Sequence, residues 1–177
     1  MSAPEIRPTL EADLPAITAI YQQAVREGTA TFELEPPDLT EMTRRYRTLI
    51  DGGYPYFVAI LDGRVAGYAY AGAYRPRPAY RFSAEDSIYL HPDAAGQGLG
   101  KQLLAALAAQ AEAAGIRKLI AVIGDSANAG SVGVHRVCGF RPAGAIHSCG
   151  WKFDRWLDIV LMERTVGPGD TAPPPQE

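Results

Sequence analysis

Residues 90–101 read Leu90-His91-Pro92-Asp93-Ala94-Ala95-Gly96-Gln97-Gly98-Leu99-Gly100-Lys101, and this stretch decides the fold of the chain. Its three glycines stand at alternate positions, after an apolar run typical of a strand and before an apolar pattern typical of a helix. Glycine lets successive backbone N–H groups turn toward one point, and a helix N-terminus carries about half a positive charge. The stretch therefore predicts a phosphate-binding turn between a strand and a helix.

Two common nucleotide-binding motifs do not fit this turn. A dinucleotide-binding G-x-G-x-x-G beginning at Gly96 or Gly98 would need glycine where Lys101 or Leu103 stands. A P-loop would need Ser or Thr after its lysine, and Gln102 occupies that position. The remaining alternative is a glycine-rich turn that binds no ligand.

Apolar patterns on both sides of the turn predict the order strand, two helices, three antiparallel strands, helix, strand, helix and two strands. Thr40 is expected to cap the second helix, and Asp62-Gly63 to form a hairpin turn. The continuous apolar run 119–123 is typical of a central strand covered on both faces. We expect strands at 6–9, 56–61, 65–74, 87–90, 119–123, 145–149 and 156–162, and helices at 11–27, 41–51, 101–114 and 128–137.

This order predicts an α/β (α+β) fold with one mixed, mostly antiparallel central sheet of about six to seven strands and helices on both faces. Residues 1–165 are expected to form a single domain, and the Pro- and Gly-rich residues 166–177 a disordered tail. Cys138 and Cys149 have neither metal-ligand nor redox spacing, so we expect two reduced, semi-buried thiols and no metal site.

The bulk composition limits the partners and the location of the chain. A net charge of −3 gives no reason to expect nucleic acid or an anionic membrane as a partner. The chain shows neither a signal-peptide pattern at residues 1–8 nor an apolar run of the roughly 20 residues that a membrane span needs. We therefore expect a cytoplasmic protein.

The glycine turn resembles the pyrophosphate-binding turn of the GNAT acetyltransferases, which commonly reads R-G-x-G-[IL]-G. The chain departs from this pattern at Ala95, where the family usually carries Arg or Gln, so we expect a weaker side-chain contact and an intact backbone cradle. Downstream, the segment 128–131 (Asn-Ala-Gly-Ser), His135 and Gly139-Phe140 resemble the second cofactor motif of the same family.

The resemblance implies the GNAT fold and acetyl-coenzyme A as cosubstrate, with no metal. It also implies that backbone N–H groups near Tyr89 and Leu90 polarise the thioester carbonyl. Asn128 and Ser131 have the alternative roles of a helix N-cap and a helix-surface serine. The implied cofactor-binding residues are Ile88, Tyr89, Leu90, Gly96, Gln97, Gly98, Leu99, Gly100, Lys101, Asn128 and Ser131.

Within that family the chain is similar to the phosphinothricin and methionine sulfoximine N-acetyltransferases. The similarity implies acetyl transfer to the primary amine of a small amino-acid analogue by direct attack in a ternary complex, and a homodimer. Two alternatives stay open: another acceptor, such as a polyamine or a protein N-terminus, and a non-catalytic coenzyme A sensor. The similar positions are Thr29, Phe32, Glu35-Pro36, Ala71-Gly72, Arg77, Ala79-Tyr80, Ala84-Glu85, Tyr89, 121–124, Lys152, Trp156 and Asp158.

Glu85 and His135 are the candidate catalytic residues. The family resemblance places a glutamate at the position of Glu85 as the base that takes the proton of the amine; its alternative is a solvated loop carboxylate beside Asp86. His135 stands where many relatives carry the tyrosine that protonates the leaving thiolate. An imidazole can serve as that acid or instead as a base, and the alternative is a core histidine bonded to the backbone.

The acceptor site is expected around the basic segment 75–81. A guanidinium of Arg75 or Arg77 beside Tyr80 suits a carboxylate or phosphinate in a bidentate pair, while exposed surface arginines are the alternative. Phe32 and Trp156 are expected to wall the pocket, although an aromatic residue is more often simply core.

Overall fold

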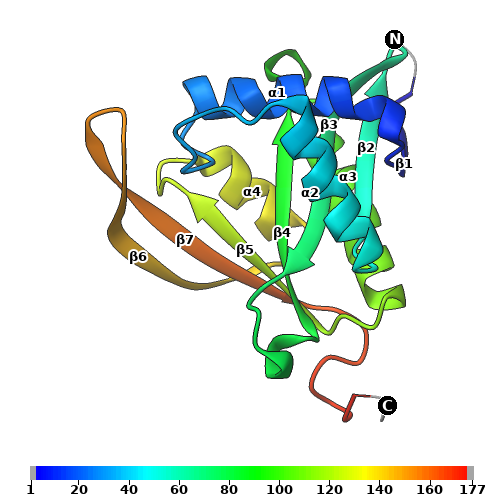
Figure 1. Cartoon of the computed structure of the whole chain (residues 1–177). Helices are drawn as coiled ribbons and strands as arrows, with labels where there is room; N and C mark the ends of the chain where they lie inside the picture. Colours follow the sequence, from blue (N-terminus) through cyan, green and yellow to red (C-terminus); the bar gives the residue numbers. More distant parts are fainter. Residues whose placement is uncertain (1–2, 175–177) are drawn as a thin grey trace.

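The computed structural model describes residues 3–174, which form one seven-stranded sheet flanked by four α-helices (Figure 1). The sheet has the order β1-β2-β3-β4-β5-β7-β6. Only β4 and β5 run parallel, so the predicted mixed, mostly antiparallel sheet is confirmed. The strands are β1 (Glu5–Pro8), β2 (Tyr56–Leu61), β3 (Arg64–Ala73), β4 (Ser83–Leu90), β5 (Lys118–Gly124), β6 (Arg141–Lys152) and β7 (Arg155–Thr165), and the helices are α1 (Leu14–Glu27), α2 (Leu39–Asp51), α3 (Leu99–Ala113) and α4 (Ala129–Val137).

The helices cover both faces of the sheet, as the sequence predicted. Side chains alternate between the two faces of a strand, so neighbouring residues of β3 enter different cores. Tyr68 belongs to the buried cluster that contains Ile17 of α1 and Tyr46 of α2, whereas Ala69 belongs to the cluster that contains Leu103 of α3. In Figure 1, α1 and α2 lie in front of the sheet and α3 lies behind it.

One turn follows the predicted chemistry, and one cap does not. Asp62 and Gly63 both have positive φ (47° and 76°), as the tight turn between β2 and β3 requires. The cap of α2 is Asp38, not Thr40, because the helix already begins at Leu39. The carboxylate of Asp38 accepts the N–H of Glu41 at 2.8 Å.

Three strands are longer than predicted. β4 begins at Ser83 because β3 pairs with it from Ala73↔Ala84 to Gly67↔Leu90, so Glu85 lies within the strand and not before it. β6 and β7 extend to a tight turn at Phe153 and Asp154, which both have positive φ. The ends of these strands are rich in Ser, Gly and charged residues, which have low strand propensity.

The parallel pair β4–β5 opens part-way along its length. The two strands pair from Ser83↔Lys118 to Asp86↔Ala121, and beyond Asp86 they diverge. Because each strand keeps its other neighbour, the gap is a fixed feature of the sheet. It leaves a cleft in the middle of the sheet.

The chain packs past the predicted boundary at residue 165. Val166 is buried and its N–H donates to the carbonyl of Arg117 at 3.0 Å, while the Arg117 guanidinium donates to the carbonyl of Gly169. The disordered tail proposed for 166–177 stays a prediction, and residues 175–177 lie outside the described residues.

The two cysteines differ from the prediction in one respect. Both are free thiols, and Cys138 is buried, but Cys149 is exposed because it lies on the outer strand β6. None of the helices in residues 3–174 is long and apolar enough to cross a membrane.

Candidate active site

The cleft between β4 and β5 exposes backbone N–H groups of β4. The N–H of His91 donates to the carbonyl of Ala66 in β3 at 2.8 Å. Since N–H groups alternate in direction along a strand, that of Tyr89 also turns toward β3, and those of Ile88 and Leu90 turn toward the open side. The amide of Leu90 therefore faces the cleft, in agreement with the prediction. The second amide that faces the cleft is that of Ile88, because the amide of Tyr89 turns toward β3.

The glycine turn joins this cleft to the N-terminus of α3. Gly98 has φ +77°, which L side chains rarely adopt, and it provides no side-chain cap for the helix. The N–H groups of Leu99, Gly100 and Lys101 therefore lack intrahelical partners, as at any helix start. Gln97 braces the turn by donating to the carbonyl of Asp93 at 2.9 Å. This geometry fits a diphosphate. The turn lies between a strand and a helix, as predicted from the sequence.

Glu85 and Asp86 are neighbours on β4 that point to opposite faces of the sheet. Glu85 is half-buried on the α1/α2 side. Burial raises the pKa of the Glu85 carboxyl, the charge of Asp86 raises it further, and the charge of Arg75 opposes the shift. A half-buried carboxylate with raised basicity suits a general base, and the alternative of a solvated loop carboxylate does not describe it.

His135 lies under the cleft and is 2% exposed. Its Nδ1 is 2.7 Å from the carbonyl of Ser131, its Nε2 is 2.8 Å from Asp86, and its ring packs edge-on against Phe140. Burial lowers the pKa of His135, but the hydrogen bond and the charge of Asp86 outweigh this effect, and the net pKa is raised. The pairing with Asp86 was not predicted from the sequence. The available signal was a carboxylate on β4 at the position between Ala84 and Ile88, which both face the core.

Asn128 and Ser131 take the capping positions of α4. The side chain of Asn128 accepts the N–H of Ser131 at 3.1 Å, so the N-cap alternative is present in the structure. Both residues also line the cleft, together with Ile88 and Gly124.

Arg75, Arg77 and Tyr80 gather around a separate hollow on the chain between β3 and β4. The guanidinium of Arg75 stacks over Tyr74 at 4.7 Å, and the ring of Tyr80 meets the same tyrosine edge-on at 5.8 Å. These groups are brought together as predicted. The charge of Arg75 lowers the pKa of Glu85, so this hollow lies within electrostatic reach of that carboxyl group.

The two predicted aromatic walls differ in position. Phe32 contacts Gly124 at the end of β5 and Gly150 of β6, so it lies beside the cleft. Trp156 is 61% exposed and packs against Trp151, 5.3 Å away, on the β6–β7 hairpin. Trp156 is not among the residues that line the cleft of this chain.

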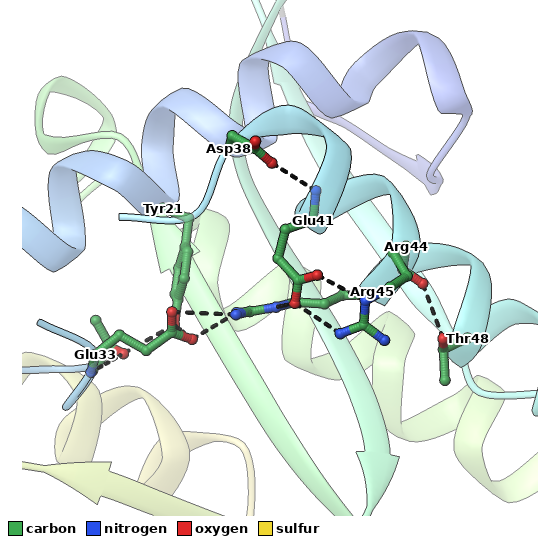
Figure 2. A network of polar contacts seen from close by, with 8 residues as sticks. Tyr21, Glu33, Asp38, Glu41, Arg44, Arg45 and Thr48 are labelled. Atoms are coloured by element: carbon green, nitrogen blue, oxygen red, sulfur yellow. Dashed lines mark hydrogen bonds and ion pairs between the residues drawn. The ribbon is translucent and has the colours of Figure 1, made fainter. Parts of the chain in front are cut away.

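A polar network fixes the loop that carries Phe32, residues 28–38 (Figure 2). The hydroxyl of Tyr21 donates to Glu33 at 2.8 Å and contacts Thr31 at 2.9 Å; burial raises the pKa of Tyr21 to about 12. Arg45 of α2 donates to the same glutamate at 2.6 Å. The buried ammonium of Lys152 donates to the carbonyl of Thr31 at 2.9 Å. No local sequence pattern predicts this network, because its members come from distant segments.

The fold and this cleft define an acetyltransferase: the chain belongs to the acetyltransferase (GNAT) family, whose sequence profile matches residues 17–140. The chain is 54% identical over 169 residues to phosphinothricin N-acetyltransferase of Alcaligenes faecalis, covering 96% of this chain and 86% of the relative. It is 42% identical to the L-methionine sulfoximine/L-methionine sulfone acetyltransferase of Pseudomonas aeruginosa, covering 98% of this chain and all (100%) of that one.

A solved structure is similar over nearly the whole chain. It is a GNAT superfamily phosphinothricin acetyltransferase from Sinorhizobium meliloti in complex with AcCoA, with a TM-score of 0.95 and 45% sequence identity. The match covers 98% of this chain and 94% of that one. Within residues 3–174 no group of three or more His, Cys, Asp or Glu side chains is arranged to hold a metal ion.

Proposed function

We propose that the chain transfers the acetyl group of acetyl-coenzyme A to the primary amine of a small amino-acid-like acceptor, such as phosphinothricin or methionine sulfoximine. The observation that carries this proposal is the opening of β4 and β5 beyond Asp86↔Ala121. This opening leaves the backbone amides of Ile88 and Leu90 without a partner strand, next in β4 to the half-buried Glu85, and the uncapped N-terminus of α3 follows β4 along the chain.

The cleft and the turn together suit acetyl-coenzyme A. The N–H groups of Leu99, Gly100 and Lys101 would hold its diphosphate, and those of Ile88 and Leu90 would face its acetyl-bearing arm. Asn128 and Ser131 line the same path. The cosubstrate supplies an acetyl thioester whose carbonyl carbon an amine can attack.

Glu85 takes the proton of the acceptor amine. An alkyl ammonium is mostly protonated near pH 7, so it must lose a proton before it attacks. The raised pKa of Glu85 makes the carboxylate a better proton acceptor than an exposed one. The amine then attacks the thioester directly, with both substrates bound.

Arg75 and Arg77 bind the anionic end of the acceptor. The hollow that they form with Tyr80 carries positive charge, and the charge of Arg75 lowers the pKa of Glu85. A guanidinium pairs with a carboxylate or phosphinate in two parallel hydrogen bonds. Phe32, held by the network around Glu33, forms the apolar wall between the acceptor and β6.

We propose in addition that two copies of the chain form a homodimer through the β6–β7 hairpin. Every residue from 141 to 149 is exposed, so both faces of β6 lack a cover in the described chain. Trp151, Phe153 and Trp156 at the end of the hairpin are each more than half exposed, and Figure 1 shows the hairpin reaching beyond the helices. Aromatic residues on a free edge strand favour a second copy as partner, and they would bring Trp156 to a shared site.

A cytoplasmic location is part of the proposal, because both cysteines are free thiols, which suits a reducing compartment.

An acceptor screen tests the function. Release of free thiol from acetyl-coenzyme A is followed with phosphinothricin, methionine sulfoximine, ordinary amino acids, a polyamine and a peptide with a free N-terminus. The proposal expects the highest kcat/KM with the two amino-acid analogues, and the N-acetyl product by mass spectrometry. Faster turnover of the polyamine or peptide would reject the acceptor class, and binding without thiol release would indicate a sensor.

A further inference from the structure

Asp86 and His135 form a buried pair at the closed end of the cleft. Their side chains are 0% and 3% exposed. Asp86 is the last residue of β4 that pairs with β5, so its side chain sits where the strands begin to separate. Both residues line the cleft.

The contacts of His135 fix the number of protons on the pair. A carbonyl oxygen only accepts hydrogen bonds, so the 2.7 Å contact between Nδ1 and the carbonyl of Ser131 requires a proton on Nδ1. The hydroxyl of Ser131 is farther from the same nitrogen, at 3.4 Å. Nε2 then faces a carboxylate oxygen of Asp86 at 2.8 Å, and two lone pairs at this distance would repel each other. A further proton therefore lies between Nε2 and Oδ2.

This count makes the pair a store of one labile proton. The pair is either an imidazolium beside a carboxylate or a neutral imidazole beside a carboxylic acid, and both forms hold the same number of protons. Both nitrogens of His135 are occupied, so the ring itself has no free N–H to offer a substrate. Oδ1 of Asp86 is the polar side-chain atom of the pair without a hydrogen-bond partner among residues 3–174.

We propose that Asp86 gives this proton to the thiolate that leaves during acetyl transfer, and that His135 is a positioning residue that keeps the pair protonated. The inference rests on the acetyl transfer proposed above. In this proposal, removal of the proton from the amine and donation of a proton to the thiolate take place on opposite faces of the sheet. Glu85 faces the acceptor amine on one face, and Asp86 faces the other.

The protons and electrons of the step balance. The amine nitrogen forms a bond to the carbonyl carbon, the C–S bond breaks, and its electron pair goes to sulfur. Sulfur takes the proton of the Asp86 carboxyl group. A half-turn about the Cβ–Cγ bond exchanges the two oxygens and moves this proton from the side of Nε2 to the position of Oδ1. The pair is left as a carboxylate and a neutral imidazole that retains its Nδ1 proton. The ammonium nitrogen loses two protons, one before it attacks and one after the C–N bond has formed, and Glu85 takes each in turn and passes it to solvent. The pair regains one proton from solvent when the thiol departs, so the reaction releases one proton overall.

The charge of Asp86 also acts on Glu85, its neighbour on β4, and on Cys138, which lies one turn after His135 just past the end of α4. Lys101 of α3 and Arg164 of β7 act on the same thiol. From β5 the pair meets apolar residues such as Ala121 and Ile123. A Cys138→Ala variant therefore serves as the control for titration of the neighbouring thiol.

The first test counts the protons directly on the whole, unmodified chain. ¹⁵N NMR of histidine-labelled protein reports the protonation of each ring nitrogen, and His91→Gln and His147→Gln variants assign the signals of the other two histidines. The proposal expects Nδ1 of His135 protonated and Nε2 either protonated or in proton exchange with Asp86 at about pH 7. An unprotonated Nδ1 would overturn it.

The second test is Asp86→Asn, which preserves size and lets the amide donate to Nε2 but removes the transferable proton. The expected result is a fall in kcat of about 10²-fold with little change in the KM for acetyl-coenzyme A. In wild type and in Cys138→Ala, kcat should fall as rising pH removes the proton of the pair, and this descending limb should be missing in Asp86→Asn.

A descending limb that persists in Asp86→Asn would overturn the assignment, even if kcat falls. Loss of thiol release with every amine in the wild type would instead reject the proposed function, while the proton count by NMR would still stand. If Asp86→Asn does not fold, His135→Gln takes its place: without the imidazole the carboxyl group should lose its proton at lower pH, so the descending limb of kcat should move to lower pH, and an unmoved limb would overturn the assignment.

Discussion

The ring of Phe32 lies directly against Gly150, so that any β-carbon at position 150 would clash with it. The contact joins the loop 28–38 to the hairpin that carries the exposed tryptophans. It also makes one wall of the proposed acceptor site depend on a residue that has no side chain. The position of Phe32 therefore depends on Gly150 as much as on its own loop.

Gly150→Ala should move Phe32 and weaken acceptor binding. We expect the KM for the acceptor to rise about tenfold, the affinity for acetyl-coenzyme A to stay unchanged, and the free energy of unfolding to fall by about 1–3 kcal/mol from overpacking. Steady-state kinetics and urea unfolding measure these changes. Gly133→Ala is the matched control, because an added β-carbon there meets nothing within 4 Å. Equal effects of the two substitutions would refute the role of the contact.

Glu85→Gln should lower kcat by about 10²-fold and remove the ascending limb of the pH–rate profile. The base acts only when deprotonated, so wild-type activity rises as the pH passes the raised pKa of Glu85. The contribution of Glu85 to the free energy of unfolding changes with pH in the opposite sense to the activity. A carboxyl whose pKa is raised on folding contributes stability below its unfolded pKa and loses it as the pH rises through the folded pKa. The variant should therefore be more stable than wild type at neutral pH, and an unchanged ascending limb would exclude Glu85 as the base.

The substitutions Gly98→Asp and Gly98→Asn separate charge from backbone strain at the glycine turn. Both introduce a side chain at φ +77°, and the two side chains have nearly the same size. The aspartate adds a negative charge at the helix N-terminus, so it should weaken acetyl-coenzyme A binding by about a further tenfold relative to the asparagine, and less so at high salt. Titration calorimetry measures the difference. Equal affinities of the two variants would show that no anion binds at this turn.

The homodimer predicts a concentration-dependent mass in analytical ultracentrifugation. Replacing Trp151 and Trp156 together by serine should shift the protein to the monomer while its circular dichroism stays the same. Leu10→Ser is the control, since Leu10 is 57% exposed and follows β1, at the opposite edge of the sheet from β6. A monomeric wild type, or a dimer that persists in the double variant, would contradict the proposed interface.

Local chemistry explains which parts of this structure could be predicted. The Asp62-Gly63 turn and the glycine turn depend on neighbouring residues, and the structure places both as expected. The cap at Asn128, the alternative role given for that residue, is equally local and is present. The order of the predicted helices and strands was sufficient to predict the fold class. The start of β4 at Ser83 was missed because pairing with β3, not strand propensity, makes this segment a strand.

The candidate site was predictable only in part, since its contacts join distant segments. The pairing of Asp86 with His135, and of Phe32 with Gly150, depends on which strands are neighbours in the sheet. Alternation along β4 likewise decides that the amide of Ile88, not that of Tyr89, faces the cleft. These relationships become visible only once the register is known.

A crystal structure of the protein with acetyl-coenzyme A tests the central claim most directly. The account predicts the diphosphate within hydrogen-bonding distance of the N–H groups of Leu99, Gly100 and Lys101, and the thioester in the opening between β4 and β5. A cosubstrate bound outside this opening, or a turn that makes no contact with the diphosphate, would contradict it.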